Sequence, residues 1–243
     1  MTKYALITGG AQRIGAAIAK SLHREGYIIL LHYGQSKEQA LALQSELNAI
    51  HPKTCIVKSV NLSFENVTEL SEWVLSKTNK LDVLVNNASL FYPTPWQEAT
   101  RVHWDQLFTT NVQVPFFLIQ ALLPALTKAQ GSVINMIDIH QERSLELHPI
   151  YGASKAALKN LTLSLAKDMA GRIRCNGVSP GAILWPEQND EIDSAAKEAI
   201  LNKIPMHKLG TVEDIAGAVL FVLQNQYING QIINVDGGRT LSS

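Results

Sequence analysis

The chain has 243 residues, of which 46% are hydrophobic, and its 21 Lys and Arg side chains balance 21 Asp and Glu side chains. This composition suits one large α/β domain with a sizeable core, and the balanced charge excludes a bulk field directed at nucleic acid or a membrane surface. The sequence shows no signal-peptide pattern, no metal-ligand spacing among its histidines and no apolar stretch of about 18 residues. We therefore expect a cytoplasmic protein without a metal or a membrane span, whose two cysteines, Cys55 and Cys175, are reduced core residues.

Short apolar runs and helical periodicity alternate along the chain. In order, they predict a strand over residues 4–8, a helix over 13–25, a strand over 27–33, a helix over 37–50, a strand over 54–60, a helix over 66–78, a strand over 81–85, a helix over 100–129, a strand over 133–137, a long helix beginning near 151, a strand over 172–178, a helix over 213–224 and a strand over 231–235. This alternation has no repeat or linker. It predicts a single domain over residues 1–243, built on one doubly wound parallel sheet with helices on both faces.

The first strand meets the first helix through a turn that contains Gly9, Gly10 and Gly15. Backbone N–H groups and the helix dipole at such a junction face an anion, and glycines let the backbone approach a pyrophosphate closely. The turn therefore indicates a dinucleotide site, although a tight turn without a ligand has the same composition.

The end of the second strand bears on the choice of cofactor. A cofactor with a free 2′-hydroxyl usually meets an acidic residue there, and the first acid in this chain is Glu38. His32, Ser36 and Lys37 offer donors for a 2′-phosphate instead, and Arg13 adds positive charge. We predict NADPH as the cofactor. Ser36 also suits a helix cap, and both roles are compatible.

The fourth strand leads into Asn86 and Asn87 and then into an aromatic, proline-containing loop. The two asparagines suit a turn, and they could also line a cofactor cleft at the carboxyl end of the strand. Phe91 could pack on a neighbouring helix or form a flat wall for a flat substrate. Asn111 lies inside a predicted helix, where Asn is unfavourable, so it is either bonded to the backbone or placed at the site.

Three chemistry-bearing side chains follow the fifth strand. Asp138 lies where the strand ends, and Tyr151 and Lys155 are four residues apart on one helix face. Lys155 is expected to lower the pKa of the Tyr151 phenol from about 10 towards neutrality, which makes it a usable general acid. The spacing by itself is weak, because Tyr33 and Lys37 share it, and an ordinary pair on a helix surface is the alternative.

The last third of the chain completes the predicted sheet. The sixth strand ends in Pro180 and Gly181, and the final strand is followed by Asp236 and two glycines. Residues 182–206 are expected to form a substrate lid, with Trp185 and Pro186 followed by an acidic amphipathic helix.

Taken together, these motifs resemble the short-chain dehydrogenase/reductase family over nearly the whole chain. The resemblance implies a Rossmann-like fold, a nicotinamide cofactor and a homotetramer. It implies cofactor contacts from Gly9, Arg13, Ile14, Gly15, His32, Tyr33, Ser36, Asn61, Leu62, Asn87, Ala88, Tyr151, Lys155, Pro180 and Gly181.

Two positions depart from the general family pattern in a way that resembles the pteridine reductases. Arg13 stands where the family usually has a middle glycine, and Asp138 stands where it usually has a serine. The loop NNASLFYPTPW is also similar to that subgroup. The resemblance implies that Arg13 reaches the pyrophosphate and the pterin, Ser89 bonds the pterin and Phe91 stacks on it.

The same resemblance assigns the remaining catalytic roles. Tyr151 with Asp138 would deliver the proton, Lys155 would hold the nicotinamide ribose, and Asn111 would support a water relay behind the lysine. Two residues near the cofactor differ from the subgroup, namely Gln35 in place of an arginine and Asn61 in place of an aspartate.

A physical argument also favours a pterin. A ketone that accepts hydride develops an alkoxide, which the Asp138 carboxylate would repel, whereas a C=N bond needs a proton on nitrogen. We predict an NADPH-dependent reductase of a pterin, dihydropterin or dihydrofolate. The alternatives are a ketone or 3-oxoacyl reductase of the same fold and a non-catalytic NADP(H)-binding regulator, which Tyr151, Lys155 and Asn111 together disfavour.

Overall fold

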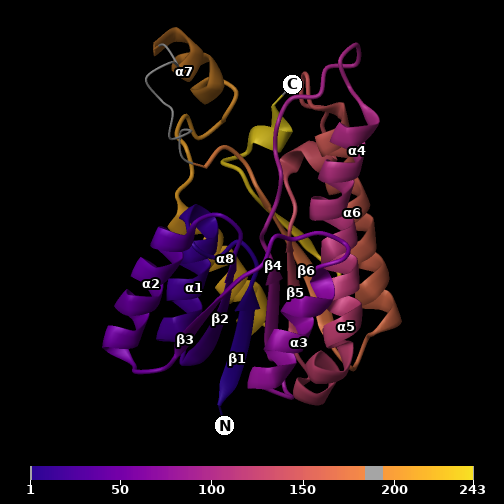
Figure 1. Ribbon diagram of the computed structural model, residues 1–243. Coiled ribbons are helices and arrows are strands. Elements are labelled where there is room, and N and C mark those ends of the chain that lie inside the picture. Colours follow the sequence, from indigo (N-terminus) through magenta and orange to yellow (C-terminus); the bar gives the residue numbers. More distant parts are fainter. Residues whose placement is uncertain (1, 184–193, 243) are drawn as a thin grey trace.

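The core of the molecule is a parallel β-sheet (Figure 1). Within residues 2–183 and 194–242, which the computed structural model describes, seven strands lie in the order β3-β2-β1-β4-β5-β6-β7. They are β1 Lys3–Ile7, β2 Tyr27–Tyr33, β3 Cys55–Ser59, β4 Val83–Asn86, β5 Ser132–Met136, β6 Arg174–Pro180 and β7 Ile232–Val235, and every neighbouring pair is parallel. The predicted α/β class and doubly wound parallel sheet are confirmed.

Helices cover both faces of the sheet. They are α1 Arg13–Arg24, α2 Lys37–Ile50, α3 Val67–Lys77, α4 Arg101–Phe108, α5 Val114–Ala129, α6 Pro149–Asp168, α7 Ser194–Leu201 and α8 Val212–Gln224, with short 3₁₀ helices η2 Ile139–Gln141 and η4 Arg239–Leu241. Figure 1 shows α1, α2 and α8 on one side of the sheet and α3, α5 and α6 on the other.

The strands are apolar on both faces because each face is buried under helices. In β1, Ile7 belongs to the cluster with α1, α2 and α8, while its neighbour Leu6 belongs to the cluster with α3 and α5. In β2, Leu31 and Leu30 divide in the same way. Cys55 and Cys175 are buried and free, as expected for core residues.

The chain order creates a crevice at the carboxyl edge of the sheet. From β1 the chain moves outward to β2 and β3, and then returns past β1 to form β4 on the other side. Loops from the two halves diverge at this point, and ligands of open α/β sheets bind there.

The predicted helix over residues 100–129 is interrupted. A π-helical turn, η1 Thr109–Gln113, separates α4 from α5 and contains the buried Asn111. The stretch Arg101–Ala129 is long and apolar enough to cross a membrane by length and composition, and within it α5 packs against α3, β4 and β5 in the way a core helix does. Thr211 and Asp214 form a complete capping box at the start of α8.

The predicted lid falls partly outside the described residues. Trp185 and Pro186 lie in the range 184–193, which the structure does not describe. Of the predicted acidic helix, α7 covers Ser194–Leu201. The lid therefore stays a prediction.

Candidate active site

A cleft of about 990 Å³ opens at the carboxyl edge of the sheet. Its walls come from the turn after β1, the ends of β2 and β3, the loop after β4, and the end of α4. Among the predicted cofactor residues, those that line it are Gly9, Arg13, Ile14, Gly15, His32, Tyr33, Ser36, Asn61, Leu62, Asn87 and Ala88. The cleft thus contains most of the predicted cofactor residues, whereas Tyr151, Lys155, Pro180 and Gly181 lie outside its lining.

The glycine turn is a close-packed cradle. A Cβ on Gly15 would lie 2.4 Å from the Gly9 carbonyl oxygen and 2.7 Å from Asn87 Nδ2, so no other residue fits there. Asn87 Nδ2 donates to the carbonyls of Thr8 at 3.0 Å and Gly9 at 2.8 Å, which ties the loop after β4 to the turn. A narrow backbone cradle at the start of a helix fits the pyrophosphate of a dinucleotide.

Arg13 begins α1 with a left-handed backbone, at a φ of 48°. Non-glycine residues enter this region at a cost of about 1–2 kcal/mol. The Arg13 side chain is exposed and borders the cleft, so the strained position directs a cation at the site.

His32 does not offer the free donor that we expected for a 2′-phosphate. Its Nδ1 accepts from the Gly9 N–H at 3.1 Å, and its Nε2 contacts the Val60 carbonyl at 2.9 Å. Burial lowers the pKa of this imidazole, in spite of an opposing effect from the Val60 carbonyl. The neutral ring therefore braces the glycine turn from beneath.

The other predicted phosphate ligands differ in their surroundings. The Ser36 hydroxyl accepts from Gln12 Nε2 at 2.9 Å, which joins the loop after β2 to the glycine turn, and it makes no helix-capping hydrogen bond. Lys37 is exposed and lies outside the residues that line the cleft.

Pro180 ends β6, and Gly181 is packed so closely that a Cβ would lie 2.7 Å from Asp236 Cα.

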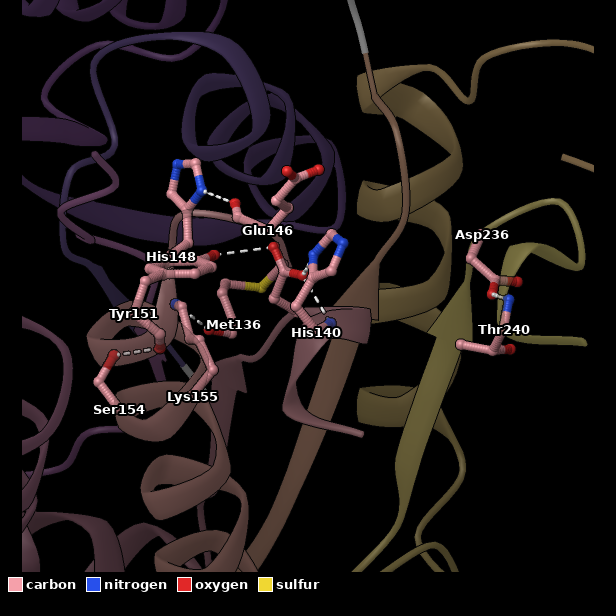
Figure 2. Close-up of polar contacts among 10 residues, drawn as sticks. Met136, His140, Glu146, His148, Tyr151, Ser154, Lys155, Asp236 and Thr240 are labelled. Atoms are coloured by element: carbon pink, nitrogen blue, oxygen red, sulfur yellow. Dashed lines mark hydrogen bonds and ion pairs between the residues drawn. The ribbon is translucent and has the colours of Figure 1, made fainter. Parts of the chain in front are cut away.

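The structure brings Asp138 and Tyr151 together beyond the end of β5. The Tyr151 hydroxyl donates to Asp138 Oδ2 at 2.8 Å, and the tyrosine is buried (Figure 2). The same strand and helix are also joined by a buried hydrogen bond, in which Asn135 Nδ2 of β5 donates to Thr162 Oγ1 of α6 at 2.8 Å.

His140 is a member of this site that the sequence analysis missed. Its backbone N–H and its ring Nδ1 both contact Asp138 Oδ1, at 2.9 Å and 2.6 Å (Figure 2). Burial raises the pKa of the Asp138 carboxyl, but the hydrogen bonds and charge of His140, together with the Tyr151 hydrogen bond, hold it below its usual value. The close spacing of Asp138 and His140 after a strand was the only signal available.

The expected effect of Lys155 on the Tyr151 pKa is not what the structure shows. Burial, followed by the charge of Asp138 and its hydrogen bond, raises the pKa of Tyr151 well above its usual value. Lys155 Nζ donates to the Met136 carbonyl at 2.9 Å and lies 5.7 Å from the centre of the tyrosine ring. Burial lowers the pKa of Lys155 to about 8, with Asp138 opposing the shift. With its pKa raised in this way, the phenol keeps its proton at neutral pH.

Asn111 clamps the loop after β4 to α6. Its Oδ1 accepts from the Ser89 hydroxyl at 3.0 Å and the Leu90 N–H at 2.9 Å. Its Nδ2 donates to the Leu90 carbonyl at 3.1 Å and to Ser154 Oγ at 3.0 Å. An amide makes at most about four such bonds, so the predicted water relay cannot use this side chain and would need the Asn111 backbone.

Phe91 lies beside Tyr151 and is 57% exposed. Its ring stacks on His148, with 4.6 Å between the ring centres and an interplanar angle of 10°, and it forms a T-shaped pair with the Tyr151 ring, with 4.8 Å between the centres. Core packing does not account for an aromatic side chain that is this exposed, so the interpretation of Phe91 as a wall for a flat substrate is favoured. His148, the N-cap residue of α6, is a second residue near Tyr151 that the sequence analysis missed.

The carboxyl-terminal segment is attached to the same region. Arg143 Nη1 donates to the backbone carbonyls of Arg239 and Ser242. The guanidinium of Arg239 is close enough to Asp138 for the two charges to interact. Within the described residues, no group of three His, Cys, Asp or Glu side chains could hold a metal ion.

Comparison with known proteins places the chain among reductases. A family model described as enoyl-(acyl carrier protein) reductase matches residues 9–240. Pteridine reductase 1 of Leishmania tarentolae is 33% identical over 281 residues, covering 98% of this chain and 96% of that protein. The 3-oxoacyl-[acyl-carrier-protein] reductase FabG of Staphylococcus aureus is 34% identical over 242 residues, covering 98% of both chains.

A third relative carries the family's name. Short-chain dehydrogenase/reductase FrzI of a Cladobotryum species is 29% identical over 248 residues, covering 98% of this chain and 96% of that protein. These matches extend over the glycine cradle, the clamp at Asn111 and the Tyr151–Lys155 helix alike. The chain therefore belongs to the short-chain dehydrogenase/reductase family and is an oxidoreductase that uses a nicotinamide cofactor.

Proposed function

We propose that the protein reduces a pterin, dihydropterin or dihydrofolate with NADPH. The observation that carries this proposal is the 2.8 Å hydrogen bond from the Tyr151 phenol to the Asp138 carboxylate. A ketone reductase needs hydrogen-bond donors, and no anion, where negative charge develops on oxygen. A carboxylate beside the phenol opposes that charge, whereas it is compatible with protonating a ring nitrogen.

The residues of the site divide the work of such a reduction. When bound, the nicotinamide supplies the hydride. Tyr151 donates the proton, Asp138 orients the phenol, and Lys155, which has donors left beyond its bond to Met136, would hold the ribose. The exposed face of Phe91 and the Ser89 oxygen, which can still accept a hydrogen bond, suit a flat heteroaromatic ring.

The cleft also supports NADPH rather than NADH. Among its lining residues, Tyr33 ends β2 and is followed by Gly34, Gln35 and Ser36, and none of these four is acidic. An acid there would accept from a ribose hydroxyl and repel a phosphate. Arg13 and the Ser36 hydroxyl remain as the groups that could favour the 2′-phosphate, and we expect kcat/KM for NADPH to exceed that for NADH at least about tenfold.

A 3-oxoacyl reductase is the second candidate, and the identity values support it. The relatives named as 3-oxoacyl-[acyl-carrier-protein] reductases are as similar to this chain as the one named as a pteridine reductase. Asp138 distinguishes the two candidate functions. Its negative charge is unfavourable next to the alkoxide that develops in 3-oxoacyl reduction, so it favours the pterin reductase.

Kinetics on both substrate classes tests the proposal. NADPH oxidation is followed with pterin, dihydropterin and dihydrofolate on one side and with a 3-oxoacyl thioester on the other. We expect turnover with the first class. Asp138→Ser should lower it, while any trace activity on the thioester holds or rises. Faster wild-type turnover of the thioester would reject the pterin assignment in favour of the second candidate.

The resemblance further leads us to propose a homotetramer. An apolar groove between α5 and α6, lined by Phe116, Ile119, Leu123, Leu158 and Leu161, is consistent with burial against another subunit. Light scattering coupled to size-exclusion chromatography would show a tetramer mass, and a monomer at micromolar concentration would contradict the proposal.

A further inference from the structure

His140 contacts the acid at the centre of the site and has no role in the mechanism above. Its ring Nδ1 lies 2.6 Å from Asp138 Oδ1, and its backbone N–H donates to the same oxygen at 2.9 Å. The other oxygen, Oδ2, receives the Tyr151 hydroxyl. The carboxylate thus bridges an imidazole and a phenol, with one oxygen for each (Figure 2).

Asp138 is the charged side chain that contacts His140, and the nearby Glu142 and Arg143 have partners of their own. Asp138 is the carboxylate in direct contact with the ring, and Tyr151 faces the carboxylate from α6. Glu142, in the same loop, is paired with Lys159 of α6 at 2.7 Å. Arg143 is held by backbone carbonyls of the carboxyl-terminal segment, from which Arg239 contributes positive charge near Asp138.

His140 also has its own access to the outside of the protein. The side chain is 15% exposed, and it borders a second cavity, of about 800 Å³. The lining of that cavity shares no residue with the lining of the cofactor cleft. Water that enters this second cavity can therefore reach the ring and exchange a proton with it.

We infer that His140 is a positioning residue and proton store for the Asp138–Tyr151 pair, returning a proton to it after each turnover. This inference rests on the proposed proton delivery by Tyr151. Each reduction takes one proton from Tyr151, and His140 replaces that one proton. The Tyr151 O–H bond breaks as the substrate N–H bond forms, and the protonated His140 passes its Nδ1 proton to Asp138.

Asp138 then reprotonates the tyrosinate. A half-turn about its Cβ–Cγ bond exchanges the two carboxyl oxygens and presents the new proton to Tyr151. His140 is left neutral and takes a proton from water. No oxidant or reductant enters these steps.

The contact itself is tested in the ligand-free protein. In a proton NMR spectrum of protein with isotope-labelled histidine, the Nδ1–H of His140 should appear far downfield, because it donates to a carboxylate. The signal should be absent in His140→Asn and should move upfield in Asp138→Asn. A wild-type His140 whose Nδ1 carries no proton at neutral pH would overturn the inference.

Kinetics then separates positioning from proton supply. The Asn amide can still donate to Asp138 Oδ1 but cannot carry a proton across, whereas Ala removes both functions. In His140→Asn we expect a normal first turnover with enzyme in excess, and a steady-state kcat that falls about tenfold to a hundredfold. In His140→Ala both should fall, and added imidazole should restore part of the steady-state rate. His51→Asn, at the opposite end of the sheet, is the matched control.

Failure of the proposed function and failure of the His140 inference give different results in these experiments. If the wild type reduces the thioester and not the pterins, the proposed function fails, and the same variants are compared on the thioester. Unchanged steady-state rates in both variants would overturn the role of His140. Equal losses in both variants, with no rescue by imidazole and a lowered melting temperature, would show that the ring is only structural.

Discussion

Asp138 and Asp236 follow two parallel strands, β5 and β7, and each precedes a short 3₁₀ helix at the carboxyl edge of the sheet. In each case Oδ1 accepts the backbone N–H two residues ahead at 2.9 Å, from His140 and from Gly238. The local structures are therefore alike.

The second oxygen makes the difference. Asp236 Oδ2 accepts the backbone N–H of Thr240 at 2.7 Å, so that its own loop satisfies both oxygens. Asp138 Oδ2 accepts the Tyr151 hydroxyl from α6, and its Oδ1 also contacts the His140 ring. Backbone amides do not give up protons at neutral pH, whereas phenols and imidazoles do. A carboxylate at a strand end is thus structural or reactive according to what its second oxygen reaches.

The largest expected effect comes from removing the Tyr151 hydroxyl, the proton donor that Asp138 contacts and Asp236 does not. Tyr151→Phe deletes the phenol and leaves the ring, so pterin turnover should fall by about 10²–10⁴-fold. Fluorescence titration should show nearly unchanged NADPH affinity. Turnover within threefold of wild type would mean that another group supplies the proton.

Asp138→Asn should lower kcat by about tenfold to a hundredfold, because the amide can no longer exchange a proton with Tyr151 or His140. Steady-state kinetics at saturating NADPH measures the change, with the cofactor Kd as the control. If this variant reduces dihydropterin as fast as wild type, the carboxylate is structural, and the contrast with Asp236 disappears.

Asp236→Asn should show the opposite pattern, namely lost stability with activity per folded molecule retained. The amide donors would face the Thr240 N–H, and we expect a loss of about 1–3 kcal/mol in the free energy of unfolding from urea titration. Burial raises the pKa of Asp236, but hydrogen bonds from Thr240 and Gly238 hold it below its usual value.

The pH dependence of that loss has a definite sign. A carboxyl whose pKa is lower in the folded state stabilises the fold above its unfolded pKa, and this contribution is lost as pH falls through the folded pKa. The difference in unfolding free energy between wild type and Asp236→Asn should therefore be constant above about pH 5 and shrink below about pH 4. A difference that grows on acidification would contradict this assignment.

The smallest expected effect is at the substrate wall beside the reactive carboxylate. Phe91→Ala should raise KM for a pterin about three- to tenfold, the equivalent of one aromatic stacking contact. Because the ring is 57% exposed, the melting temperature should change little. A large drop in melting temperature with an unchanged KM would show that Phe91 serves the fold.

The sequence was sufficient for features that depend on local pattern. The buried strands are recognisable as apolar runs, and the glycine cradle follows from Gly9 and Gly15 at the first strand–helix junction. Tyr151 and Asp138 could be paired because parallel strands and the helices after them converge at one edge of the sheet.

The residues that were missed or misjudged depend on loop conformation. His140 and His148 lie in the connection between β5 and α6, whose path the strand and helix periodicities do not give. His32 was expected to bind phosphate, but its ring points beneath the glycine turn, a direction that strand periodicity does not give. The pKa of Tyr151 was misjudged because burial and the Asp138 carboxylate both raise it. Lys155 does not offset them, since it donates to the Met136 carbonyl, a partner that no spacing rule indicates.

The bonds from Arg143 to the carbonyls of Arg239 and Ser242 bear on how this protein should be handled in the laboratory. They connect Arg239 and Ser242 to the loop that carries His140. The start of β1 lies at the opposite end of the strands, as Figure 1 shows. A purification tag fused behind Ser242 would pull on the loop that orients Asp138. A tag placed ahead of Lys3 would be remote from the chemistry and is the better choice for every assay described above.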